Sequence, residues 1–185
     1  MFWDERDVEN FIAQHPEVID CDAILAQQFE IGGVGIADLV GLRVRHPYSG
    51  TPAIAVIEIK KGKIDPAAVA QLHRYVYALS TAMDDLRSKE QTMDWFPIFG
   101  ILVGDSLDHD AKVLCWELNF EVYQYTCQFS VATKPLLGPR RWLDTQVVVS
   151  QVNPHNFLYV VKKANEILAS RGTATSAGDG VTDEE

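Results

Sequence analysis

Four short runs favour strands, and the last three of them are apolar. The runs are residues 27–31, 36–44, 54–60 and 96–104. Short apolar runs of this kind are typical of strands, and the third is apolar on both faces before Glu58, which predicts a central buried strand. The segment from His46 to Pro52 is rich in turn residues, so we expect it to join the second and third runs as a hairpin. Gly32 to Gly35 predict a turn between the first two runs.

Helical spacing of apolar positions marks three further segments, residues 4–14, 66–82 and 154–171. Asp4 is an expected N-cap of the first, and Asp65 followed by Pro66 predicts the start of the second. Gly172 is an expected stop for the third. The middle helix would then be a right-handed crossover between two parallel strands. The predicted fold class is α/β, with a mixed central sheet flanked by helices.

The remaining segments have weaker patterns. Residues 19–26 predict a second turn or short helix, and residues 83–95 a short helix or an excursion over the strands. Residues 105–110 are acidic and contain His109, but turn and cap residues explain them better than a metal site. Residues 113–118 and 120–129 are rich in β-branched and aromatic residues, which predicts a closing hairpin.

The last third of the chain is harder to interpret. Residues 136–154 suggest an exposed basic loop, with Trp142 either stacking on a base or, as the safer interpretation, plugging an edge of the core. Residues 146–152 are a further strand candidate. The composition of residues 172–185 predicts a disordered acidic tail, which leaves residues 1–171 as a single domain.

Composition restricts the class of protein. The chain has 185 residues and no apolar run close to the roughly 20 residues that a membrane span needs. Its first residues lack the basic and apolar regions of a signal peptide. The three cysteines, Cys21, Cys115 and Cys127, are widely spaced and form no metal-binding or disulfide pattern. These features predict a reduced, cytoplasmic protein that is not attached to a membrane.

Three charged residues at the ends of the predicted hairpin strands form the main chemical motif. Glu58 and Lys60 lie two residues apart on one strand and therefore project from the same face. The hairpin could bring Asp38 beside Glu58, an unfavourable approach of like charges unless a cation lies between them. Oxygen ligands suit Mg²⁺ or Mn²⁺. Lys60 would then lie beside the bound water or neutralise charge on a phosphoryl group.

Two polar residues on the following helix extend this motif. Gln71 and Tyr75 share a helix face at i, i+4 and could point back toward the strands. Each residue alone has an ordinary explanation, such as a cap, a solvated strand face or a helix surface. Their order and spacing together favour a shared site.

The pattern of Asp38, Glu58-Ile59-Lys60 and Gln71-x-x-x-Tyr75 resembles the PD-(D/E)xK nuclease superfamily. Within it, the run from Glu58 to Tyr75, E-I-K-K-G-K-x-x-x-x-A-V-x-Q-L-x-R-Y, is most similar to the NucS-type endonucleases. The opening helix is similar as well, and the Shedu-type defence nucleases share a looser version. The likeness covers roughly the first half of the chain. Ala37 replaces the proline that names the motif, a proline that many members of the superfamily lack.

The resemblance implies a restriction-endonuclease-like fold and metal-dependent cleavage of DNA, in DNA repair or phage defence. It implies that Asp38 and Glu58 bind Mg²⁺ or Mn²⁺ together with the Ile59 carbonyl, and that Lys60 acts on the attacking water. A helix glutamate would complete the site. Glu9 is the first candidate for that role, and Glu5, one turn earlier, is the second.

The distribution of charge along the chain affects how the protein would bind DNA. The net charge is −10, yet residues 31–80 carry six basic and three acidic residues. Beside Lys60, the basic residues of this block are the candidate phosphate contacts: Arg43, Arg45, Lys61, Lys63 and Arg74. The overall acidic balance does not predict strong non-specific DNA binding by a monomer, so a homodimer, a partner protein or a bound metal would help.

Two other function classes stay open from sequence alone. The domain could be a catalytically weak or inactive nuclease-fold module that binds DNA or acts as a scaffold within a complex. The complete Asp-Glu-Lys set argues against that. The acidic segments also allow an inhibitor that mimics the charge of DNA, which would leave the ordered motif unexplained.

Overall fold

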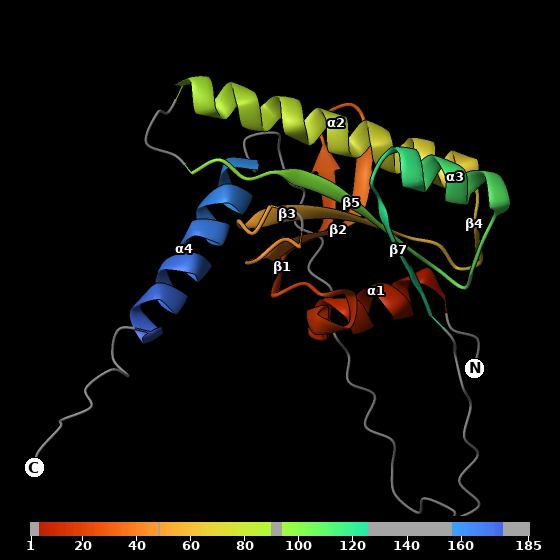
Figure 1. Ribbon diagram of the computed structural model, residues 1–185, viewed down its shortest axis with the longest axis horizontal. Helices are drawn as coiled ribbons and strands as arrows, with labels where there is room; N and C mark the ends of the chain where they lie inside the picture. The colour runs from red at the N-terminus through yellow and green to blue at the C-terminus, as the bar shows by residue number, and fades with distance from the viewer. Residues whose placement is uncertain (1–3, 48, 90–93, 126–156, 176–185) are drawn as a thin grey trace, which may run out of the picture.

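A computed structural model describes residues 4–47, 49–89, 94–125 and 157–175 of the chain. A five-stranded sheet forms its centre, in the order β1-β2-β3-β5-β7 (Figure 1). Its strands are β1 (Ala23–Ile31), β2 (Gly35–Arg43), β3 (Ala53–Ile59), β5 (Ile98–Gly104) and β7 (Glu121–Gln124). The short strands β4 (Lys63–Ile64) and β6 (Ser106–Leu107) pair separately. The helices are α1 (Glu5–Gln14), η1 (Pro16–Ile19), α2 (Pro66–Lys89), α3 (His109–Glu117) and α4 (Phe157–Thr175).

The sheet is mixed. Strands β1, β2 and β3 are antiparallel neighbours, whereas β3, β5 and β7 run parallel. The expected hairpin between β2 and β3 is therefore confirmed, as is the parallel pairing of β3 with β5 through the intervening helix α2. The α/β fold with a mixed central sheet is confirmed. None of the described helices is long and apolar enough to span a bilayer.

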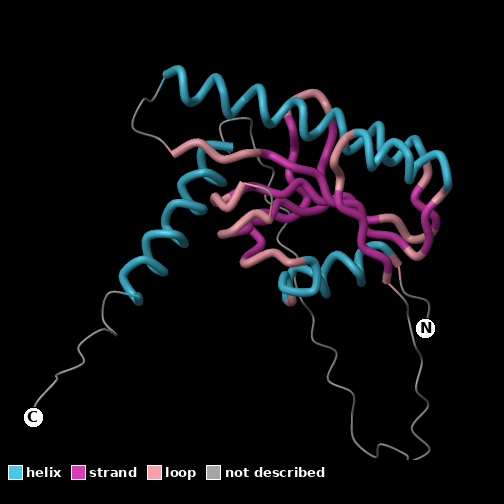
Figure 2. The backbone as a smooth tube through the Cα atoms, in the orientation of Figure 1, coloured by secondary structure: helices cyan, strands magenta, loops and turns pink. Residues whose placement is uncertain are grey.

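Helices cover both faces of the sheet (Figures 1 and 2). Helices α2 and α3 lie over one face and α1 lies against the other, while α4 packs beside β1 and the far end of α2. The side chains of Ile57 and Ile59 belong to the core on the α1 face. Those of Val56 and Leu72 belong to the core on the α2 face. Every residue of β3 is buried, as its two-sided apolar pattern predicts.

Aspartates begin the helices where the sequence predicts them. The side chain of Asp4 accepts a hydrogen bond from the backbone of Asp7, and the two form a reciprocal capping box. The Asp65 carboxylate accepts from the Ala68 backbone N–H at 2.9 Å. Asp108 caps α3 through the Asp110 N–H. Residues 105–110 were predicted as turn and cap residues before a short helix or strand, and the structure has a helix there.

The prediction for residues 113–118 was wrong, since residues 113–117 lie in helix α3, Leu118 is its C-cap, and the segment forms no closing hairpin. The buried residues of this segment, Ala111 and Cys115, are four apart, which is helical spacing. Val113 and Trp116, which favoured a strand, face solvent instead. Strand β7 consequently pairs in parallel with β5.

Other boundaries differ from the predictions. Residues 19–26 form the end of η1 and then the start of β1, because Leu25 belongs to the same buried side as Phe29. Helix α2 runs to Lys89 rather than ending near residue 82, since Met83 continues its buried stripe. Helix α4 passes through Gly172 to Thr175. The basic loop and strand predicted within residues 136–154, and residues 176–185 of the predicted tail, lie outside the described residues.

Candidate active site

The candidate site lies where β3 ends and β2 begins. The antiparallel register pairs Leu39 with Ile57. One residue further along this ladder, Asp38 stands beside Glu58, as the predicted hairpin requires. The structure thus brings the two acidic residues of the motif together on adjacent strands.

Hydrogen bonds fix the Asp38 carboxylate from two directions. Its Oδ2 accepts from the Ile59 backbone N–H at 2.7 Å, and its Oδ1 lies 3.4 Å from the donating Nε2 of Gln28. Burial raises the pKa of Asp38, while the Ile59 hydrogen bond and the charge of Lys60 act in the opposite direction. The backbone contact ties the position of this carboxylate to the strand that carries Glu58.

Glu58 is the more deeply buried carboxylate, with 3 % of its surface exposed. Its Oε1 accepts from the Lys60 ammonium at 2.6 Å. Its Oε2 has no hydrogen-bond partner among the described residues. Burial first, and the charge of Asp38 second, raise the pKa of Glu58 to about 7. Burial acts to lower the pKa of Lys60, but the hydrogen bond and charge of Glu58 outweigh it and raise the pKa.

Helix α2 places its two motif residues above this ion pair. The Gln71 Oε1 lies 3.5 Å from the Lys60 ammonium, and its Nε2 donates to the Tyr75 hydroxyl at 2.9 Å. The Tyr75 ring packs against Gly35, where a Cβ would lie 2.8 Å from Cε1 of the ring. Gly35, which begins β2 at φ 154°, therefore makes room for Tyr75.

Both helix glutamates reach the site from the other face of the sheet. Glu9 is buried on α1, and its Oε2 accepts from the Gln28 amide at 2.8 Å. Burial raises the pKa of Glu9. Glu5 Oε1 accepts from the Lys61 backbone N–H at 2.8 Å, directly after the motif lysine.

Two contacts at the site have no signal in the sequence. The sequence pattern places Gln28 only in a strand, yet its amide joins Glu9 and Asp38. Tyr125 was assigned to a closing hairpin, yet its hydroxyl donates to the carbonyl oxygens of Lys60 at 3.1 Å and Lys61 at 2.8 Å. Neither lies at a motif spacing, and no local pattern identifies them.

The predicted phosphate contacts separate into two groups. Lys61, Lys63 and Arg74 are exposed and lie on the elements that carry or follow the motif, with Lys63 paired to Asp108. Arg45 is exposed but follows the opposite end of β2, roughly 20 Å from Asp38 at about 3.3 Å per strand residue.

Arg43 does not fit the expected role in DNA binding. Its side chain is buried, with 4 % of its surface exposed. It is paired with Glu121, with Nη1 2.6 Å from Oε1. Basic residues near Lys60 in sequence were grouped as one surface, but Arg43 points into the core and is unavailable to phosphate.

The donor set suits a hard cation. The described residues hold no ready cluster of three or more His, Cys, Asp or Glu side chains around a metal position. Asp38 and Glu58 are nevertheless adjacent, and the buried Glu58 Oε2 has no partner in the described part of the chain. Mg²⁺ is commonly bound by one or two carboxylates while it keeps several waters, so these residues fit it. The Ile59 carbonyl stays a predicted ligand.

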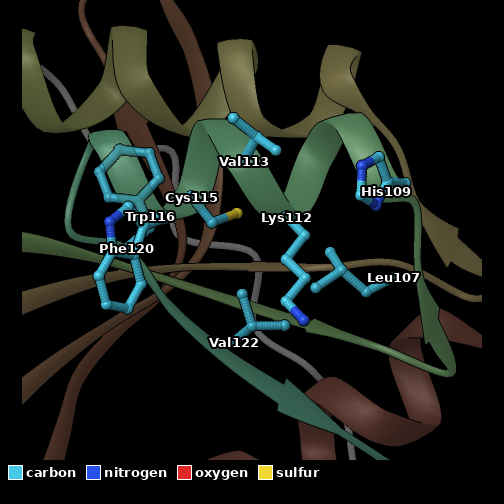
Figure 3. Close-up of a pocket in the computed structure, with 8 residues that line it drawn as sticks. All are labelled: Leu107, His109, Lys112, Val113, Cys115, Trp116, Phe120 and Val122. Atoms are coloured by element: carbon cyan, nitrogen blue, oxygen red, sulfur yellow. The ribbon is translucent and has the colours of Figure 1, made fainter.

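A separate hollow lies between α3 and β7 (Figure 3). It has a volume of about 540 Å³ and is lined mostly by apolar side chains, among them Val113, Trp116, Phe120 and Val122. No predicted site residue lines it. Trp116, on its rim, has 83 % of its surface exposed.

Comparison with known proteins agrees with this geometry. The family described as the Endonuclease NucS C-terminal domain matches residues 4–128. The chain belongs to this family. The predicted membership in the PD-(D/E)xK superfamily, close to the NucS-type endonucleases, is confirmed. The match includes α1, the hairpin and α2, which carry every residue of the motif.

The chain also resembles solved structures. A repair endonuclease from Pyrococcus abyssi is 28% identical, covers 66% of this chain and 47% of its own, and has a TM-score of 0.50. A structure of EndoMS in complex with dsDNA is 26% identical over 67% of this chain and 46% of its own, with a TM-score of 0.47. The chain therefore spans about half the length of these two solved structures.

Proposed function

We propose that this NucS-family domain is a metal-dependent DNA endonuclease that hydrolyses phosphodiester bonds. The observation that carries the proposal is the convergence of Asp38, Glu58 and Lys60, whose charges act on one another. Two carboxylates stand on adjacent strand positions, and the ammonium lies 2.6 Å from the Glu58 carboxylate. The similarity to a repair endonuclease supports DNA repair over phage defence as its setting.

The acidic residues would hold the metal ion. Asp38 and Glu58 would bind Mg²⁺ or Mn²⁺, with the Ile59 carbonyl and Glu9 as further ligands. Once bound, such an ion supplies Lewis-acid polarisation of the phosphate and makes a nearby water more acidic. The rigid backbone contact from Ile59 to Asp38 keeps one of the ligands in place before the ion arrives.

Lys60 would act through its charge. Because the pKa of Lys60 is raised, the ammonium stays protonated at neutral pH and donates hydrogen bonds. It would orient the attacking water and stabilise the charge that develops on the phosphate. Gln71 accepts from this ammonium and is itself held by Tyr75, so the two α2 residues would keep Lys60 directed at the scissile bond.

DNA would approach along the exposed basic residues next to the site. Lys61 directly follows Lys60, and Arg74 lies one turn beyond Gln71 on α2. These side chains would contact the phosphate backbone, which positions the strand without reading its sequence. Because the net charge of −10 opposes DNA binding by a monomer, a homodimer or a partner protein would strengthen the binding.

The test is cleavage of labelled single-stranded, duplex, mismatched and branched DNA with Mg²⁺, Mn²⁺ or chelator. Wild type is compared with Lys60→Ala and Asp38→Ala, and with Lys162→Ala as a control from an exposed position on α4. We expect metal-dependent cutting that falls by about 10²–10⁴-fold in the two site variants and stays unchanged in the control. Binding of DNA without cutting by wild type, on every substrate, would instead support the non-catalytic binding module.

A further inference from the structure

Gln28 has an unusual backbone conformation. Three non-glycine residues in the described ranges have positive φ, namely Asp20 (54°), Gln28 (47°) and Asn119 (53°). Asp20 and Asn119 follow helical segments and are of the residue types that tolerate this conformation. Gln28 lies inside β1 and is neither type. Unfavourable backbone of this kind persists only where its surroundings hold it, and it gathers at functional sites.

Gln28, with its positive φ, lies next to both carboxylates that its side chain contacts. The register pairs Gln27 with Leu39 and Phe29 with Ala37, so Gln28 stands opposite Asp38. Its Nε2 donates to Glu9 Oε2 at 2.8 Å and approaches Asp38 Oδ1 at 3.4 Å. One amide therefore joins the carboxylate of α1 to that of β2.

The chemistry of the amide suits this place. A primary amide nitrogen has two hydrogens and can donate to two acceptors, while ionised carboxylates can only accept. It is also neutral, so it brings the two acids together without the competing charge of a lysine or arginine. With Ile59 N–H on Oδ2, both oxygens of Asp38 have a donor close by.

We propose that Gln28 is a positioning residue of the metal site, which orients Glu9 and Asp38 so that both face the same divalent ion. This inference rests on the proposed function, because it concerns the ligands of that same site. Groups that hydrogen-bond to metal ligands fix their orientation, and their loss typically costs 10–100-fold in metal affinity. The exposed side chain of Gln28 contributes little to the core, so its role lies in those two hydrogen bonds.

The experiment measures Mn²⁺ affinity without DNA, by the loss of the free-ion signal in electron paramagnetic resonance. Gln28→Met keeps the length of the side chain and removes the amide. Gln28→Gly also removes the amide, but it accommodates positive φ without strain. Gln27→Met and Gln27→Gly are the matched controls, one residue away and exposed. Thermal unfolding of all variants without metal reports any purely structural effect.

We expect both Gln28 variants to bind Mn²⁺ about 10-fold more weakly or worse, whereas both Gln27 variants bind like wild type. Unchanged or tighter binding in the Gln28 variants would overturn the positioning role while leaving the proposed function standing. A loss in Gln28→Met that is absent in Gln28→Gly would also overturn it, since backbone strain would then be the cause. Failure of wild type itself to bind Mn²⁺ would overturn both.

Discussion

The two ends of the β2–β3 hairpin each contain a buried charged cluster, but the clusters are built differently. At one end, Arg43 Nε donates to the Asp20 carbonyl, and its two Nη atoms donate to Glu121 at 2.6 and 2.9 Å. At the other end, Glu58 meets a single cation, Lys60, beside a second carboxylate. At the guanidinium end, Arg43 and Glu121 form a one-to-one ion pair, whereas at the carboxylate end Glu58 and Asp38 are two carboxylates beside one ammonium.

The difference separates a structural cluster from the proposed metal site. Arg43 reaches across the sheet from β2 to β7, stacks 4.8 Å from the centre of the Phe99 ring, and also donates to the Ile19 carbonyl. Burial acts to lower the pKa of Arg43, but the hydrogen bond and charge of Glu121 outweigh it and raise the pKa. Glu58, in contrast, keeps one oxygen without a partner in the described residues. A buried acceptor without a donor is costly, and the cost is understandable where a cation is to be bound.

The largest expected effect is on stability at the guanidinium end. Arg43→Ala should lower the free energy of unfolding by about 3–5 kcal/mol, because it leaves the partly buried Glu121 without its cation. Urea unfolding at pH 7 measures this. Arg45→Ala, its exposed neighbour on the same segment, should change stability by no more than about 0.5 kcal/mol. A loss under about 1 kcal/mol for Arg43→Ala would contradict the structural role.

A divalent metal should stabilise the protein by binding at the carboxylate end and not at the guanidinium end. At a concentration 100 times its dissociation constant, Mn²⁺ should raise the free energy of unfolding by about 3 kcal/mol in wild type. This metal-dependent increase in the free energy of unfolding should disappear in Glu58→Gln. It should persist in Glu121→Gln, the matched substitution in the guanidinium cluster. Urea unfolding with Mn²⁺ or chelator gives the increments. An equal increment in both variants would place the metal somewhere else.

These two clusters also show how far the sequence could predict the molecule. Asp38, Glu58, Lys60, Gln71 and Tyr75 were brought together correctly because strand alternation, a hairpin and one helical turn are enough to relate them. Arg43 was misassigned because its partner, Glu121, lies 78 residues away and no local pattern connects them. Gln28 escaped notice because its role depends on a left-handed residue within a strand, which a hydrophobic pattern does not show.

The pH dependence of stability should come mainly from the carboxylate end. The pKa of Glu58 is raised from 4.5 to about 7 in the folded state. The folded protein therefore holds a proton that the unfolded chain has lost between these values, and stability contributed by this group falls as pH rises through that window. The fall is on the order of 2–3 kcal/mol.

Urea unfolding in chelator from pH 4.5 to 8 measures the slope of the free energy of unfolding against pH. Glu58→Gln, which cannot ionise, should flatten it, whereas Glu121→Gln, whose residue belongs to the guanidinium cluster, should leave it in place. Added Mn²⁺ should flatten it as well, by favouring the ionised carboxylate. A slope that Glu58→Gln leaves unchanged would mean that another group, not Glu58, sets the pH dependence.

The smallest expected effect is that of removing a tyrosine hydroxyl, and one such tyrosine lies at each end of the hairpin. Tyr123 donates to Asp20 Oδ2 at 3.0 Å in the guanidinium cluster, and Tyr125 donates to the carbonyls of Lys60 and Lys61. Removing either hydroxyl with phenylalanine should cost about 1 kcal/mol of stability. Only Tyr125→Phe should also slow DNA cleavage, by a few fold, because it frees the backbone that carries Lys60. If the two variants lose equal stability and cleave DNA at equal rates, Tyr125 stabilises the fold but does not position the Lys60 ammonium.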